Sequence, residues 1–289
     1  MLHDKLRLIS QKNKGTSKAI AEYLLSNSTN LSLLDVKDVA RETYTSQASV
    51  IRLVQKLGFS KWRYFVKEYI REQTFMDKLG TVNVNLPFSK NSTTNEVIDN
   101  VSALEIESIK NTQYLLNTDD VNKIVEIIEN SNRIVIFSLQ PNYYMARSFK
   151  RKMLSIGKNI EVAEDGQFGL KAASLDKNDC AIIVSYSGSE FIGSVTQVKK
   201  LRKNMVKTIA ITSESNNFLI KNSDYQIEIP TNEHLSNKIA NYASEISVNF
   251  IFDILFSVIF KYNFEDNLNY KIVNSLDLEK ARFNDQIER

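Results

Sequence analysis

Hydroxyl-bearing side chains gather in one short segment of the chain, directly after a run of apolar residues. The apolar run covers 180–184, and Ser185-Tyr186-Ser187-Gly188-Ser189-Glu190 follows it. Hydroxyl groups and free backbone N–H groups between a strand and a helix suit an anion, because a helix N-terminus carries about half a positive charge. The segment therefore predicts an anion-binding loop, with Ser185, Ser187, Ser189 and Glu190 as candidate ligand-binding residues. Serines that only cap the helix and tighten the turn would give the same pattern.

A second group of residues has the composition of a DNA-binding surface. Between residues 52 and 71 the chain carries six Lys or Arg residues and the single acid Glu68. Residues 1–79 hold 14 Lys or Arg and 8 Asp or Glu, a net charge of +6, while the rest of the chain has a net charge of −3. A basic end on a mildly acidic body indicates a polyanion partner, and a helical bundle with a solvated basic face is the alternative.

Helices are expected to carry these basic residues. Apolar spacing predicts four helices in the first quarter of the chain, at 16–27, 36–42, 46–57 and 61–74. Thr16 or Ser17 is expected to cap the first of them, because a side-chain oxygen there can accept from the free N–H groups of the first turn.

The segment 36–55 has the pattern of two helices joined by a tight turn. Val39, Val50 and Leu53 fall on the buried side. Ala40 falls where the helices cross, and a small residue is needed there because the two axes approach closely. Tyr44 occupies the turn position at which glycine is usual, and a non-glycine residue at positive φ costs about 1–2 kcal/mol. The sequence therefore predicts a helix-turn-helix whose turn differs in shape from the usual one.

The outer side of the second helix of this pair would meet DNA. Ser46 is placed to cap the helix, whose N-terminus would enter the major groove. Gln47 could pair with adenine through two hydrogen bonds, and Arg52 could pair with guanine or contact a phosphate. The candidate DNA-binding residues are Ser46, Gln47, Ser49, Arg52, Lys56, Lys61 and Arg63.

Several short motifs stand together in this first part of the chain. They are Val39-Ala40, Thr45-Ser46-Gln47-Ala48-Ser49-Val50-Ile51-Arg52, Lys56-Leu57-Gly58-Phe59-Ser60, Trp62 and Phe65. In this combination they resemble the N-terminal domain of RpiR-type (MurR/RpiR) regulators, in which a Lys-Leu-Gly-Phe segment ends the recognition helix and an aromatic-rich helix follows. The resemblance implies double-stranded DNA as a partner and favours DNA binding over a plain helical bundle.

The rest of the chain has the pattern of an α/β domain. Pro87 and the polar run 89–95 have linker composition, so the predicted domains are 1–79 and 96–289, with a linker at 80–95. Two helical segments, near 96–116 and 119–130, precede the predicted strands, and a long apolar helix at 235–262 follows them. The strands are predicted at 133–139, 159–163, 180–186, 208–212 and 225–229. Strands that alternate with helical segments predict a five-stranded parallel sheet flanked by helices on both faces, a doubly wound fold.

Three segments of this second domain resemble SIS (sugar isomerase) domains. Ser185-Tyr186-Ser187-Gly188 after an apolar strand is similar to their phosphate loop, residues 133–137 fit their first strand, and residues 244–256 fit their C-terminal helix. RpiR-type proteins carry this domain at their C-terminus. The resemblance implies a domain that forms dimers and senses a phosphorylated sugar.

The loops of the predicted phosphate site depart from the family pattern. Where the family has Gly-x-Gly-x-Ser after the first strand, this chain has Ser138-Leu139-Gln140-Pro141-Asn142, so a changed loop is expected, with Gln140 and Asn142 as candidate ligand-binding residues. Glu190 stands where the family has a threonine that holds phosphate, and Glu245 replaces a common arginine. A carboxylate at the position of Glu190 would repel a phosphate dianion, although an acid in the first turn of a helix is also favourable by about 0.3–1 kcal/mol.

The composition argues against several other classes of protein. With one cysteine, Cys180, and two histidines, neither an internal disulfide nor a Cys/His metal site is expected, and no cofactor is expected either. The first residues lack the pattern of a secretion signal, and no apolar run of the ~20 residues that cross a bilayer is expected. These observations predict a cytoplasmic protein that does not enter a membrane.

Three functions remain open at this point. The sequence favours a DNA-binding transcription regulator of sugar or amino-sugar genes, a homodimer or a dimer of dimers whose C-terminal domain senses a phosphosugar. The second is a phosphosugar isomerase, but isomerisation needs a positioned acid and base. Only His3 and His234 offer imidazoles, and both phosphate loops are altered, so catalysis is not expected. The third is a regulator whose SIS-like domain no longer binds a ligand.

Overall fold

The computed structural model divides the chain into two compact units. It describes residues 2–12, 15–27, 34–76, 82–189, 194–213, 217–230, 233–234 and 236–287. The first unit is Met1–Thr81 and the second is Val82–Arg289. Residues of the interval 80–95, for which the sequence predicts a linker, belong to the second unit from Val82 onward.

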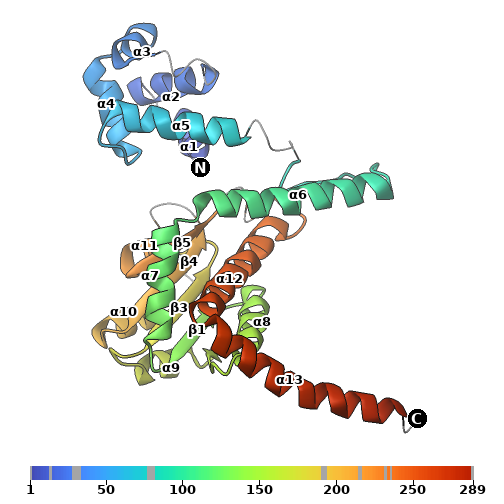
Figure 1. Cartoon of the computed structure of the whole chain (residues 1–289). Helices are drawn as coiled ribbons and strands as arrows, with labels where there is room; N and C mark the ends of the chain where they lie inside the picture. Colours follow the sequence, from blue (N-terminus) through green and yellow to red (C-terminus); the bar gives the residue numbers. More distant parts are fainter. Residues whose placement is uncertain are drawn as a thin grey trace. The chain divides into compact units, whose positions relative to one another are not determined.

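Helices joined by short turns make up the described residues of the first unit (Figure 1). Its helices are α1 (Leu2–Lys12), α2 (Thr16–Ser26), α3 (Val36–Glu42), α4 (Gln47–Lys56) and α5 (Trp62–Met76). The four predicted helices lie within two residues of their predicted ends, and α1 was not predicted. The N-cap of α2 is Gly15 without a side-chain cap, so the expected capping by Thr16 or Ser17 is wrong.

The core of this unit is built by one face of each helix. Val39, Val50 and Leu53 are buried as the sequence predicts, and Ala40 is buried between α3 and α4. Aromatic side chains of α5 complete the core, because Phe65 and Tyr69 are fully buried. Burial of this apolar area stabilises the pair α3–α4, which is too short to be helical alone.

The turn between α3 and α4 keeps a residue in the left-handed region. Tyr44 has φ of 52° and is 97% exposed, so its side chain gains no packing. Thr45 N donates to Ala40 O at 2.9 Å, and Thr43 Oγ1 donates to Val39 O at 2.7 Å. These bonds satisfy the last carbonyl groups of α3 and hold the turn in this shape. Tyr44 therefore carries backbone strain that glycine would avoid.

A buried carboxylate joins the two ends of the first unit. Glu72 of α5 is 3% exposed, and its oxygens accept from Leu2 N at 2.6 Å and His3 N at 2.9 Å. Its Oε1 also lies 3.1 Å from His3 Nδ1. Burial alone raises the pKa of Glu72, but the hydrogen bonds from His3 and Leu2 outweigh it and hold the pKa below the ordinary carboxyl value. Glu72 thus caps α1 from a position 70 residues away in sequence.

The second unit contains a parallel sheet in the order β2-β1-β3-β4-β5. The strands are β1 (Ile134–Ser138), β2 (Glu161–Val162), β3 (Cys180–Ser185), β4 (Lys207–Ser213) and β5 (Tyr225–Ile229). Each lies where the sequence predicts a strand, and the fold class is confirmed. The predicted run at 159–163 is reduced to a two-residue edge strand.

Helices cover both faces of the sheet (Figure 1). The helices of this unit are α6 (Thr94–Leu115), α7 (Thr118–Glu129), α8 (Asn142–Leu154), α9 (Phe168–Ser174), α10 (Ser194–Lys203), α11 (Phe218–Asn222), α12 (Tyr242–Tyr262) and α13 (Phe264–Ile287), of which α13 extends away from the sheet (Figure 1). Helices α7, α8 and α12 share one apolar core with Ile134 and Ile136, and α9, α10 and α11 share another with Val135 and Phe137. This split follows from the alternation of side chains along a strand.

The most apolar helix of the second unit is α12. This 21-residue helix contains an 18-residue stretch with a mean hydropathy of 1.7, which would allow it to span a membrane by length and composition, so the expectation of no such run is wrong. In the fold α12 packs against α6, α7 and α8, and Phe252 stacks on Phe149 with ring centroids 4.8 Å apart. These contacts are those of the core helix of an α/β domain. Helix α12 begins at Tyr242, later than the predicted start at 235.

We expect Glu72→Gln to lower the free energy of unfolding of the first unit by about 1.5–3 kcal/mol at neutral pH, because buried hydrogen bonds to a charged group are lost. Since the pKa of Glu72 is lowered in the folded state, its contribution is present above the ordinary carboxyl pKa of about 4.3 and is lost as the pH falls through the folded-state value. Urea unfolding at several pH values measures both effects. The control Glu22→Gln removes an exposed ion pair and should change stability by less than about 0.5 kcal/mol; equal losses in the two variants would contradict the capping role.

Candidate functional site

The predicted DNA-binding residues lie at the N-cap of α4, along α4, and at the start of α5. Ser46 is the N-cap of α4, as predicted, and its Oγ accepts from Ser49 N at 3.2 Å. Gln47, Arg52 and Lys56 are exposed, while Ser49 is half-buried. Arg52 Nε donates to Ala48 O at 3.3 Å, and the residue is exposed. The first turn of α4 therefore presents polar side chains that can donate and accept.

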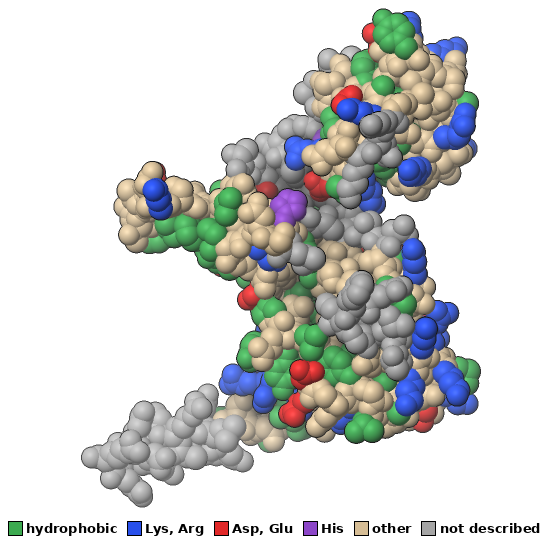
Figure 2. Space-filling model, turned by 180° about the vertical axis from the view of Figure 1, so that it is seen from behind, with side chains coloured by type: hydrophobic (Ala, Val, Ile, Leu, Met, Phe, Trp, Pro, Cys, Tyr) green, Lys and Arg blue, Asp and Glu red, His purple; other side chains and the backbone are tan. Residues whose placement is uncertain are grey.

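Lys61 and Arg63 extend this basic surface beyond α4, and both are exposed. The Arg63 guanidinium lies 4.8 Å from the centre of the Tyr64 ring and donates to Tyr64 Oη at 2.9 Å. On the face of the first unit that Figure 2 shows, Lys and Arg side chains project at several places along its outer edge. Exposed cations with few neighbouring acids suit contacts to phosphates.

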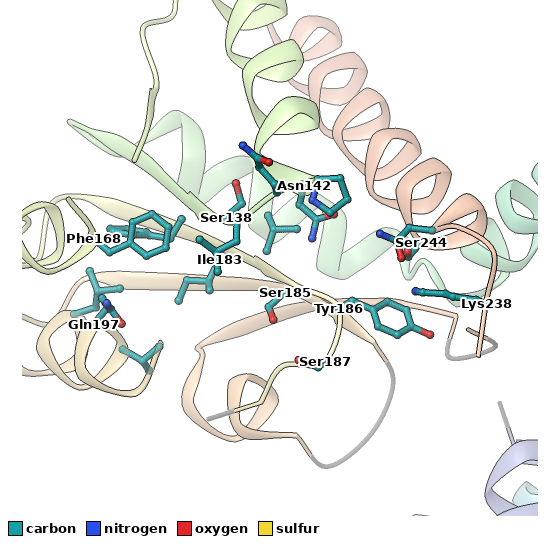
Figure 3. A pocket seen from close by; sticks show the side chains of 18 residues that line it. Ser138, Asn142, Phe168, Ile183, Ser185, Tyr186, Ser187, Gln197, Lys238 and Ser244 are labelled. Atoms are coloured by element: carbon teal, nitrogen blue, oxygen red, sulfur yellow. The ribbon is translucent and has the colours of Figure 1, made fainter. Parts of the chain in front are cut away.

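The second candidate site is a cavity of about 200 Å³ in the second unit. It lies at the carboxyl ends of β1 and β3, where the strand order changes direction. At such a point the following helices leave to opposite faces of the sheet, which opens a crevice used for ligands in doubly wound folds. Gln140, Asn142, Ser185 and Ser187 all line the cavity, so the structure brings together residues from both predicted loops (Figure 3).

The two remaining predicted residues have different outcomes. Ser189 lies beside the cavity rather than in its lining, and its N–H donates to Ser187 Oγ at 3.4 Å. Glu190 lies outside the described residues, so its expected repulsion of phosphate stays a prediction.

The serine loop after β3 is held in one shape by its neighbours. Gly188 has φ of 53°, and a Cβ there would come within 2.3 Å of the Asn217 side chain. Asn217 caps α11 and donates through Nδ2 to Thr212 Oγ1 and Ser213 O. Only glycine allows this approach, which keeps Ser185 and Ser187 at the cavity.

The loop after β1 turns directly into α8. Pro141 precedes the helix without a side-chain cap, and Asn142, the first residue of α8, lines the cavity, while Tyr143 N and Tyr144 N donate to backbone carbonyl groups. Ser138, the last residue of β1, is 3% exposed, and its Oγ has no hydrogen-bond partner within the described part of the chain. The same holds for Gln197 Oε1 of α10. Two buried polar atoms in the lining of one cavity are therefore open to hydrogen bonds from a molecule that enters it.

The opposite end of the cavity contains an ion pair. Lys238 Nζ lies 2.6 Å from Glu233 Oε2, and the two side chains are 12% and 1% exposed. Lys238 also lies 5.4 Å from the centre of the Tyr186 ring. In Figure 3, Tyr186, Lys238 and Ser244 lie together at this end, away from Phe168 and Gln197. Nothing in the spacing of Tyr186, Lys238 and Ser244 along the chain predicted this grouping.

A second carboxylate lies close to this ion pair. Burial raises the pKa of Glu245, a hydrogen bond from Asn241 lowers it, and the Glu233 carboxylate raises it further. Glu245 stands where the family commonly has an arginine, and it therefore adds negative charge beside Glu233. Within the described residues, no three His, Cys, Asp or Glu side chains are grouped so that they could hold a metal ion.

Two family models match the chain, one in each unit. The model for "Helix-turn-helix domain, rpiR family" matches residues 2–72, and the model for "SIS domain" matches residues 127–252. The first match contains α3 and α4, and the second contains every strand of the sheet. The pair defines a transcription regulator with a helix-turn-helix domain and a sugar-isomerase-like domain.

The chain is similar to known proteins over almost its whole length or over its second unit. An uncharacterized HTH-type transcriptional regulator of Clostridium perfringens is 24% identical over 271 residues, which cover 92% of this chain and 95% of the relative. The solved Vibrio vulnificus NanR protein, complexed with ManNAc-6P, covers 96% of this chain and 98% of its own, with a TM-score of 0.58 and 18% identity. The sugar isomerase domain of an RpiR transcription factor from Sphaerobacter thermophilus covers 63% of this chain and 98% of its own, with a TM-score of 0.55 and 17% identity. The chain belongs to the RpiR-type transcriptional regulators.

We expect Gly188→Ala to destabilise the second unit by about 1–3 kcal/mol, because the new Cβ adopts positive φ and collides with Asn217. Gly169→Ala is the matched control. Gly169 lies in α9 with open space around its Cβ, so alanine should leave stability unchanged or raise it by up to about 1 kcal/mol. Thermal unfolding of both variants tests this, and an unaffected Gly188→Ala protein would show that the loop is not held by this contact.

Proposed function

We propose that this regulator reads double-stranded DNA by inserting the N-terminus of α4 into the major groove. The observation that supports this most directly is the capped first turn of α4, from which Gln47 and Arg52 are exposed on a unit of net charge +6. Lys56, Lys61 and Arg63 are then placed to contact phosphates on either side.

Operator recognition by a helix-turn-helix protein usually requires two copies. We infer a homodimer that places two copies of α4 in half-sites one helical turn apart, about 34–36 Å. A dimer of dimers would bind two such operators. Because its partner is chromosomal DNA, we place the protein in the cytoplasm.

We propose that the cavity of the second unit binds a phosphorylated sugar and that this ligand regulates DNA binding. The regulated genes are then those of sugar or amino-sugar metabolism. Serine hydroxyls and the N-terminus of α8 suit a phosphate, and unpartnered Ser138 Oγ and Gln197 Oε1 suit sugar hydroxyls. The structural likeness to NanR supports the same class of ligand, since that protein was solved with ManNAc-6P.

We propose that the cavity senses its ligand without converting it. Aldose–ketose isomerisation needs a base and an acid within hydrogen-bond reach of the sugar. The described residues that line the cavity include no His, Asp or Glu, and the one cation, Lys238, is paired with Glu233. The competing interpretation is that the SIS-like domain no longer binds a ligand. It is supported by Glu190 and by the altered loop at 138–142.

For DNA binding, we expect Gln47→Ala and Arg52→Ala each to cost about 1–3 kcal/mol and to relax base preference at one position. Lys61→Ala should instead weaken all sequences about equally and reduce the dependence of log K on log salt by about 0.9. Fluorescence anisotropy with a genomically mapped operator and with random DNA, at several salt concentrations, separates the two effects. The docking would be refuted if Gln47→Ala and Arg52→Ala kept the wild-type ratio of operator to random affinity.

For the cavity, a calorimetric panel of hexose, pentose and amino-sugar phosphates should contain at least one compound that binds and shifts operator affinity. Ser185→Ala and Ser187→Ala should each weaken that compound by about 1–3 kcal/mol, because a buried phosphate oxygen loses a donor. Incubation of the same compounds should yield no isomerised product. If no compound binds the wild type, the interpretation of a lost sensor is correct, and turnover would instead establish an isomerase.

A further inference from the structure

The carboxylate of Glu233 is held as a bound anion would be held. Its Oε1 accepts from Ser244 N at 2.9 Å, and its Oε2 accepts from Ser244 Oγ at 2.8 Å and from Lys238 Nζ at 2.6 Å. Glu233 itself is 6% exposed. One ammonium, one hydroxyl and one backbone N–H thus surround a single carboxylate.

The backbone N–H in this site belongs to the first turn of α12. That helix has 21 residues, and its N-cap Asn241 makes no side-chain capping bond. The N-terminus of a long helix favours negative charge, and Glu233 supplies a carboxylate from outside the helix in addition to Glu245 of its first turn.

The site opens onto the cavity. Lys238, Asn241 and Ser244 all line it, together with Tyr186, whose hydroxyl donates to Glu233 O at 3.0 Å. At the β1 side of the same cavity, Ser138 Oγ is buried and has no partner within the described residues. A ligand that satisfies Ser138 would therefore occupy the space that leads to Lys238 and Ser244.

Glu233 also belongs to a segment that holds the start of the second unit. His234 N donates to Asn85 Oδ1 at 2.7 Å, and Ile239 N donates to Asn85 O at 2.9 Å. Asn85 is 9% exposed and stands four residues after Thr81, the last residue of the DNA-binding unit. His234 directly follows Glu233 and Ile239 directly follows Lys238, so the segment is held to Asn85 through a residue next to each member of the ion pair.

We propose that Lys238 and Ser244 form an anion subsite of the effector cavity, that Glu233 occupies it in the unliganded protein, and that an acidic group of the effector displaces Glu233 and loosens the hold on Asn85. The proposal rests on the proposed ligand-binding role of the cavity and names the chemistry of its second end: a phosphate or carboxylate. A phosphate or carboxylate that approaches Lys238 is repelled by the Glu233 carboxylate, and the single hydroxyl hydrogen of Ser244 can be donated to only one of the two anions, so binding of the effector and release of Glu233 are coupled.

The binding half of the proposal is tested with inorganic phosphate as the probe. We expect Glu233→Gln to bind phosphate at least about tenfold more tightly than the wild type, because the competing charge is gone. In the double variant Glu233→Gln/Lys238→Met the gain should disappear. Equal phosphate affinity in the wild type and Glu233→Gln, or a gain that persists without Lys238, would overturn the subsite.

The coupling half is tested by amide hydrogen exchange in the full chain. Exchange at His234 and Ile239 should be at least about fivefold faster in Glu233→Gln than in the wild type, since the segment loses its anchor. The double variant carries no unpaired buried charge and should show the same acceleration, which covers the case in which the single variant folds poorly. Asn85→Ala serves as the reference for release of His234.

The matched control is Glu129→Gln, which breaks another largely buried pair, Glu129–Lys158 at 2.7 Å, elsewhere in the same unit. If Glu129→Gln accelerates exchange at His234 and Ile239 equally, or if neither Glu233 variant does so, Glu233 does not hold the segment. These results do not depend on the sugar-phosphate panel. A wild type that ignores every sugar phosphate refutes the proposed effector, whereas an unchanged Glu233→Gln refutes only the subsite.

Discussion

The parallel pairing of β1 with β3 is the constraint on which the second unit depends. Because β2 and β3 lie on opposite sides of β1, the chain leaves the carboxyl ends of β1 and β3 toward opposite faces of the sheet. That divergence opens the cavity and brings the loop at 138–142 to the loop at 185–189, although more than 40 residues separate them. It also directs the N-terminus of α8 toward the same space. If the strands followed their order in the chain, all connecting helices would lie on one face of the sheet, and no crevice would open at this edge.

Each unit uses a buried carboxylate to complete the N-terminus of a helix that is remote in sequence. Glu72 accepts from the first N–H groups of α1, and Glu233 accepts from Ser244 in the first turn of α12. The free N–H groups of a helix end must be satisfied, and a buried carboxylate needs donors, so each group meets the requirement of the other. The consequence differs between the units. Glu72 joins the two ends of a small helical domain, whereas Glu233 lies beside a cavity, where another anion can compete for its partners.

The strain at Tyr44 shows how the DNA-reading part tolerates an unfavourable residue. The hydrogen bonds from Thr43 and Thr45 to the end of α3, and the buried contacts of Ala40 and Val50, impose the turn. Together they outweigh a backbone cost of about 1–2 kcal/mol. The first turn of α4 therefore keeps its exposed position, and the chemistry of that turn is set by Gln47 and Arg52 rather than by the turn itself.

Local pattern was enough to determine the helix-turn-helix, the five strands and the serine loop, because apolar periodicity and N-capping act over a few residues. Gln140 and Asn142 were candidates only through the resemblance to the SIS loop after the first strand, whereas Ser185 and Ser187 were candidates as hydroxyls after an apolar strand, and all four line the cavity. Local pattern missed α1, misplaced the cap of α2 and took 80–95 for a linker, although Asn85 is buried and bonded to 234 and 239. It also could not find Ser138, Lys238 and Ser244 as one group. Contacts between residues up to 149 positions apart depend on how whole elements pack, and no short-range pattern encodes them.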